Sequence, residues 1–182
     1  MKTRRRYSLI VILMAVAVLF VASTTLAAAT TDVKQIVYQG SGKITVQFEE
    51  KVKYNDDVTV AVKDNSNTTY TATVKSKSAS KMQIKIKSIK AGKTYKVTIK
   101  GIKSGNAVCS LKIYAKSKAV TVAKNKSKAT SINSVKSSAD TYNGYAVWRI
   151  TFNGSISGTD FKFTYLIKQQ TNKVMYTKRE QA

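Results

Sequence analysis

Lysine side chains recur at alternate positions along the middle of the chain, where their ammonium groups could attract anions. From Asn65 to Ala139 the chain contains no Asp or Glu, yet seventeen lysines lie between Lys75 and Lys136. Charge of one sign that no neighbour neutralises gives a folded surface a positive potential, which concentrates anionic partners near it. The candidate polyanion-binding residues are Lys81, Lys85, Lys87, Lys96 and Lys100.

The residue types that most enzyme and metal chemistry needs are absent or rare. The sequence has no histidine, which excludes Ser-His-Asp and Cys-His catalytic sets, an imidazole base and the usual zinc ligands. The one cysteine, Cys109, cannot form a disulfide within the chain. Cys109 alternates with Ala107, Leu111 and Ile113, a pattern that predicts a buried core thiol. We therefore expect a non-catalytic protein with no cofactor and no metal site.

The positive charge belongs to the mature part of the chain and comes almost wholly from lysine. The full sequence has 32 basic and nine acidic residues; removing residues 1–29 takes away four basic residues and no acid, and leaves a net charge of +19. Only Arg149 and Arg179 are arginines in that remainder. Because lysine is a flexible point charge without a bidentate fork, this composition favours diffuse attraction over specific nucleic-acid recognition.

Residues 1–29 have the composition of a secretory signal peptide. Basic residues at positions 2, 4, 5 and 6 precede an apolar run at 9–22, and alanines at positions 27 and 29 suit a signal peptidase. The apolar run is shorter than the roughly 20 residues of a spanning helix, which favours cleavage after Ala29 over retention as a membrane anchor. We expect a secreted or cell-envelope-associated protein.

The outward lysines have two interpretations. They could form a surface for anionic envelope polymers or lipid headgroups, or they could merely solubilise exposed strands and discourage pairing at sheet edges. A net charge of +19 exceeds what solubility requires, so the binding interpretation stands beside the solubility interpretation with about equal weight. The positions expected to point outward are Lys43, Lys63, Lys81, Lys85, Lys87, Lys96, Lys100 and Lys112.

Residues 30–114 alternate between apolar and polar side chains with the period of two that is typical of strands. Seven such runs in about eighty residues predict a β-sandwich, because a sheet with an apolar face has to bury it against another layer. The expected strands cover residues 33–38, 43–48, 58–63, 69–75, 81–87, 94–100 and 107–113.

A local motif opens the sixth of these strands. Residues 89–95 read IKAGKTY and end at Tyr95. This segment resembles the tyrosine corner of fibronectin type III and related Ig-like domains, in which a Tyr hydroxyl bonds back to the backbone. More broadly, residues 32–114 are similar to the Ig-like modules of bacterial surface proteins. The resemblance implies a seven-stranded Ig-like β-sandwich.

The pattern changes after Ile113. Ser117 is the expected N-cap of a helix that reaches about Lys128. The residues expected on neighbouring turns of this helix are Ala119, Val122, Ala123 and Lys126. Alternation returns at residues 131–138, 145–153, 160–168 and 173–178. Asn-Gly pairs at 143–144 and 153–154 are turn signals, and the second connection is expected to run on to Gly158, longer than a two-residue hairpin. Residues 115–182 are therefore expected to form a small α+β domain, with one helix packed on an antiparallel meander.

Two segments of this second domain resemble the PepSY family. AVTVA at residues 119–123 resembles its helix motif, and YLIKQQTNKVM at residues 165–175 resembles its closing hairpin. Lys168 stands where the family has Asp, and Asn172 stands where it has Gly; Asn tolerates the left-handed conformation that such a turn needs. The resemblance covers about residues 115–180. It implies an extracytoplasmic interaction module or one that restrains peptidases.

Trp148, the only tryptophan, could be a ligand platform or a core residue. It shares its side of the strand with Ile150 and Phe152, which favours packing between sheet and helix. The same argument applies to the aromatic residues of the next strand, which are Phe161, Phe163 and Tyr165. An exposed stacking surface for nucleic acid is therefore not expected.

Charge, export signal and motifs together predict a non-catalytic extracytoplasmic binding module with a strongly basic surface. Its expected partner is an anionic cell-envelope polymer, lipid headgroups or another surface protein, and no specific nucleic acid is expected. The alternative is an extracellular peptidase regulator or inhibitor that acts through the PepSY-like domain, with the sandwich as a spacer.

Overall fold

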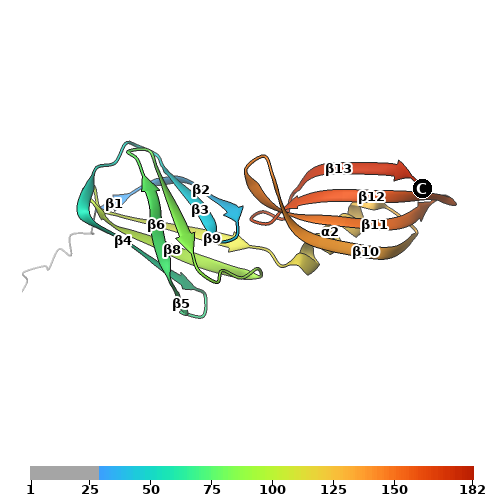
Figure 1. Cartoon of the computed structure of the whole chain (residues 1–182), viewed down its shortest axis with the longest axis horizontal. Helices are drawn as coiled ribbons and strands as arrows, with labels where there is room; N and C mark the ends of the chain where they lie inside the picture. Colours follow the sequence, from blue (N-terminus) through green and yellow to red (C-terminus); the bar gives the residue numbers. More distant parts are fainter. Residues whose placement is uncertain (1–28) are drawn as a thin grey trace, which may run out of the picture.

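The computed structural model describes residues 29–182, which form thirteen strands and one helix (Figure 1). The predicted signal peptide, apart from Ala29, lies outside the described residues. The chain is mainly β, as the sequence predicts, and no helix within 29–182 combines the length and apolar character needed to span a bilayer. The elements are β1 (Thr30–Thr31), β2 (Val33–Gly40), β3 (Lys43–Phe48), β4 (Tyr54–Asp64), β5 (Thr69–Tyr70), β6 (Ala72–Lys77), β7 (Lys81–Ile86), β8 (Lys93–Ile102), β9 (Asn106–Ile113), α2 (Lys116–Ser127), β10 (Ser131–Tyr142), β11 (Tyr145–Ile156), β12 (Thr159–Lys168) and β13 (Val174–Gln181).

Strands β1 to β9 form two sheets that enclose one apolar core. The first sheet has the order β1-β9-β8-β4-β5 and the second has the order β2-β3-β7-β6; all pairs are antiparallel except β1 with β9. Most inward positions predicted by the alternation are buried, and Ile44, Ile84 and Tyr95 from three different strands are at most 1% exposed; Val58, Val60 and Cys109 are half-buried. Two sheets around a shared core are consistent with a β-sandwich.

The strand count in this part of the described chain is nine, where seven were expected. The additional strands, β1 and β5, have two residues each and lie at the two edges of the first sheet. The single strand expected at residues 69–75 is wrong, because the chain changes sheets at Thr71: Tyr70 pairs with Val62, whereas Ala72 pairs with Ile86. Segments of two residues are too short for a period-two pattern to reveal them.

Tyr95 makes the backbone contacts that the tyrosine-corner motif predicts. Its hydroxyl donates to the Lys90 carbonyl oxygen at 2.8 Å and accepts from the Lys90 N–H at 2.7 Å. Its ring meets the ring of Tyr70 edge to face, with centroids 5.1 Å apart. These contacts fix the loop that precedes β8 against the core.

Strands β10 to β13 form an antiparallel meander that shares a second core with α2. The helix covers one side of this sheet (Figure 1), where Ala119 and Ala123 belong to the same buried cluster as Phe152. Burial follows a spacing of four residues through Ala119, Ala123 and Ser127, whereas Lys126 is exposed. Small alanines let the helix approach the sheet closely.

The expected N-cap of α2 is also wrong. The helix begins at Lys116, so the N-cap position is Ala115, which offers no side-chain hydrogen bond. Ser117 lies in the first turn, and its carbonyl oxygen accepts from the Thr121 hydroxyl at 3.1 Å. Because β9 ends at Ile113, only two residues separate strand from helix, and this short connection sets the start of the helix in place of a cap.

Turn chemistry is confirmed at one Asn-Gly pair and wrong at the other. Asn143 and Gly144 both have positive φ, and they join β10 to β11 as a two-residue hairpin. Asn153 and Gly154 lie inside β11, so the connection expected to run from this pair to Gly158 is shorter and consists of Ser157 and Gly158. A Cβ at Gly154 would lie 2.5 Å from a carbonyl oxygen of β10, so this glycine serves close strand approach. Asn172 takes the left-handed conformation expected of it, with φ 56°.

The two cores meet at a joint formed by Tyr114, Gln169 and Gln170. The Tyr114 N–H donates to the Gln169 carbonyl oxygen at 2.7 Å. The Gln170 side chain bonds to two backbone groups of β2, an edge strand of the second sheet, at 2.7 and 3.2 Å. Ala146 of β11 is buried in the core of the first two sheets. The joint therefore connects residues that lie more than a hundred positions apart in the chain.

Candidate polyanion-binding surface

The five candidate lysines do not form one surface. Lys81 and Lys85 lie in β7 and Lys87 follows it, whereas Lys96 and Lys100 lie in β8. β7 belongs to the second sheet and β8 to the first, and the residues between these lysines point into the shared core. The outward sides of the two sheets face opposite directions, so the structure separates the candidates into two groups.

On the first sheet, lysines gather across three strands. Lys96 lies directly opposite Lys63 of β4, and Lys112 of β9 lies opposite Thr94 of β8. Like charges directly opposite each other destabilise a sheet, so the pairing of Lys63 with Lys96 is not explained by a contribution to fold stability. We call this surface the β8 face, and its exposed lysines are Lys63, Lys96, Lys100 and Lys112.

On the second sheet two lysines also lie directly opposite each other. Lys43 lies opposite Lys85, and Gln47 lies opposite Lys81. The Lys85 ammonium group donates to the Ser41 carbonyl oxygen, and the residue as a whole is half-buried. This bond engages the Lys85 ammonium group, whereas Lys43, Lys81 and Lys87 are exposed, so the second sheet also carries free positive charge.

The lysines of both groups are free of carboxylate partners. Within residues 29–182 three ion pairs are present, and their cations are Lys93, Arg149 and Lys178. None of these is a candidate residue. The candidate lysines therefore keep their charge for an external anion.

Asp64 forms a buried polar cluster that the sequence analysis missed. Its side chain is fully buried, on the same side of β4 as Val62. The alternation that predicts an inward Val62 places Asp64 inward too, which is the signal that could have found it. The carboxylate accepts hydrogen bonds from the Lys93 ammonium group, the Tyr70 hydroxyl and the N–H groups of Ser66 and Thr68.

These contacts control the protonation of Asp64. The hydrogen bond from the Lys93 ammonium group holds the pKa of the Asp64 carboxyl far below its usual value, with smaller contributions from Tyr70 and two backbone N–H groups, and against the effect of burial. The same bond raises the pKa of Lys93. Because the buried carboxylate accepts hydrogen bonds from four donors of the protein itself, the cluster stabilises the fold.

Cys109 lies on the inward side of β9, as predicted, but is half-buried instead of fully buried. Burial raises the pKa of its thiol to about 11.

We expect the Cys109 thiol to react slowly with a chromogenic disulfide reagent at pH 8, where about one thiol in a thousand is ionised, and the rate to rise about tenfold per pH unit. Rapid reaction at pH 8, followed by absorbance, would contradict the packing of this strand.

Trp148 lies where the core interpretation places it. It is half-buried against the cluster that α2 shares with the sheet. Its indole N–H donates to the Tyr114 carbonyl oxygen at 3.0 Å, which commits its one polar group to the joint. Phe163 and Tyr165 are likewise buried in that cluster, so these rings stabilise packing.

No group of three or more His, Cys, Asp and Glu side chains that could hold a metal ion occurs within the part of the chain that the structure describes. Comparison with protein families, with curated proteins and with solved structures finds no match to this chain.

Proposed function

We propose that this protein is exported and acts outside the cytoplasm as a non-catalytic binding module for anionic envelope polymers. The observation that carries the proposal is the β8 face, where four exposed lysines lie on one side of one sheet and none of them pairs with a carboxylate. Such a surface attracts a polyanion at long range and holds it through many weak contacts. The proposed export rests on residues 1–29 of the sequence.

The proposed architecture is an Ig-like sandwich at residues 30–114 joined to a PepSY-like domain at 115–182. Two sheets around one core and the hydroxyl contacts of Tyr95 support the first assignment. A helix on an antiparallel meander and the left-handed Asn172 support the second. In this proposal the sandwich carries the β8 face, and the joint holds the second domain in a fixed position beside it.

The test is sedimentation of the purified secreted protein with isolated bacterial cell walls. Retention is expected to fall steeply between about 0.01 and 1 M salt, over which the screening length shrinks from about 30 to 3 Å. The triple change Lys63→Gln, Lys96→Gln and Lys100→Gln is expected to weaken binding about tenfold, since each exposed contact contributes about threefold or less.

The matched control removes the same charge from α2 through Lys116→Gln, Lys118→Gln and Lys124→Gln, three exposed positions. It is expected to weaken binding by no more than about threefold, through the change in net charge alone. Retention that is insensitive to salt, or equal losses in the two triple variants, would contradict the assignment of the β8 face.

A further inference from the structure

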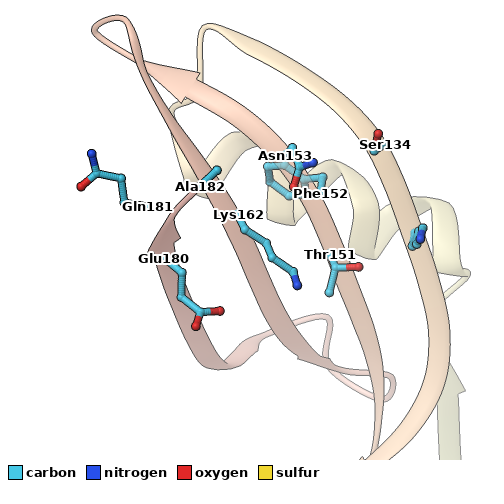
Figure 2. Close-up of a pocket in the computed structure, with 9 residues that line it drawn as sticks. Ser134, Thr151, Phe152, Asn153, Lys162, Glu180, Gln181 and Ala182 are labelled. Atoms are coloured by element: carbon cyan, nitrogen blue, oxygen red, sulfur yellow. The ribbon is translucent and has the colours of Figure 1, made fainter.

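The meander of β10 to β13 has one side that faces away from α2, and this side carries a second polar surface (Figure 2). Phe152 is buried against α2, so its neighbours Thr151 and Asn153 point to the other side of the sheet. Thr151 lies opposite Lys136 of β10, and Asn153 lies opposite Lys162 of β12. We call this surface the open face, and its polar residues are Ser134, Lys136, Thr151, Asn153, Lys162 and Glu180.

The open face is hollowed. Its residues line a depression of about 540 Å³, a volume that suits one or two sugar-sized groups. Figure 2 shows Thr151, Lys162 and Glu180 on adjacent strands around this depression, with α2 behind the sheet. Hydroxyl, amide and charged side chains therefore line the depression together.

Lysines outnumber carboxylate side chains around the depression. Glu180 lies directly opposite Lys162 and is paired with Lys178 at 2.8 Å, whereas Lys136 and Lys162 belong to none of the ion pairs within residues 29–182. Register places these two lysines two strands and two residues apart, which separates their Cα atoms by about 12 Å. That separation fits two successive charges along a polymer better than one isolated ion.

We propose that the open face binds one repeat of an anionic polymer that also carries hydroxyl groups, such as a polyol phosphate. Lys136 and Lys162 contact successive anionic groups, and Thr151 and Asn153 bond to the hydroxyls between them. The only aromatic residue that lines the depression is Phe152, which is 1% exposed, so base stacking gains no support. This site rests on the proposed function, to which it adds the chemical class of the polymer.

The experiment titrates the purified secreted protein with poly(glycerol phosphate), and with inorganic polyphosphate as a polyanion that lacks hydroxyls. Lys136→Gln with Lys162→Gln is expected to weaken binding of poly(glycerol phosphate) about tenfold, because two ammonium contacts are lost. The matched control, Lys116→Gln with Lys118→Gln on α2, is expected to change it by less than about threefold.

Thr151→Val separates this site from diffuse attraction. Valine keeps the shape and the strand propensity of threonine but removes the hydroxyl. We expect about threefold weaker binding of poly(glycerol phosphate) and unchanged binding of polyphosphate, because one neutral hydrogen bond contributes on this scale. Folding of each variant is checked by the thermal midpoint.

The outcomes distinguish two failures. If the unaltered protein binds neither polymer, the proposed function and the open-face site are both wrong. If the unaltered protein binds both polymers but the Lys136 and Lys162 variant loses no more affinity than its control, only the open-face site is wrong. Equal effects of Thr151→Val on both polymers would also overturn the role of the hydroxyl.

Discussion

Asp64→Ala is expected to lower the thermal midpoint of the protein by about 10 °C or more, the range of substitutions that break a buried polar network. The substitution removes the acceptor for four donors at once: the Lys93 ammonium group, the Tyr70 hydroxyl, and the N–H groups of Ser66 and Thr68. The bonds from Ser66 and Thr68 stabilise the turn between β4 and β5, and the bond from Lys93 connects the start of β8 to this turn. Calorimetry at neutral pH measures the change.

The same cluster gives stability a pH dependence whose sign follows from the pKa shifts. The pKa of Asp64 is lowered in the folded state, whereas an unfolded Asp titrates near about 3.9. The stabilisation is therefore complete above about pH 5 and is lost progressively as the pH falls through the unfolded and then the folded value. Lys93 has the opposite sign, because its raised pKa stabilises the fold at low and neutral pH and ceases to do so in strongly alkaline solution.

Lys93→Met is the matched variant for this cluster, because it leaves the carboxylate buried without its cation. We expect the thermal midpoint of both variants to vary less between pH 6 and pH 3 than that of the unaltered protein, since the pKa shift of Asp64 depends first on Lys93. A steep acid transition that survives in Asp64→Ala would show that other carboxylates dominate acid unfolding, and would contradict this account.

The period of two accounts for most of what the sequence could predict about the fold. It places Ile44, Met82 and Val97 inside because a strand alternates its sides, whatever sheet it joins. The same local rule cannot say which sheet a strand enters. Lys85 and Lys96 satisfy one outward pattern, yet they lie in β7 and β8 of different sheets. For this reason the candidate lysines could be named from the sequence but not assembled into a surface.

The sequence predictions of local structure are wrong where tertiary contacts override local signals. The Asn-Gly pair at 153–154 is a strong turn signal, yet Gly154 lies within a strand because β10 passes too close for a Cβ. Ser117 is a good capping residue, yet the helix starts where β9 leaves only two residues of connection. The open face was missed for a related reason, since Lys136 and Lys162 come from strands that register alone brings near each other.

Gln170→Ala is expected to uncouple the two cores and to lower the free energy of unfolding by about 1–3 kcal/mol, the cost of leaving buried backbone groups without partners. The side-chain amide of Gln170 donates to the Ile36 carbonyl oxygen at 2.7 Å and accepts from the Tyr38 N–H at 3.2 Å. Both partners belong to the edge strand β2 and are buried residues. Alanine leaves this donor and acceptor unsatisfied at the joint.

Two native reporters make the uncoupling measurable. Trp148 fluorescence follows the second core next to the joint, and the reactivity of Cys109 follows the first core. Urea transitions seen by the two reporters should coincide in the unaltered protein and separate in Gln170→Ala, because each core then unfolds with its own stability. Gln35→Ala, which removes an exposed glutamine from the same strand, is the control and should leave the transitions together. Coincident transitions in Gln170→Ala would mean that Ala146 and the Tyr114 backbone bond hold the joint without this side chain.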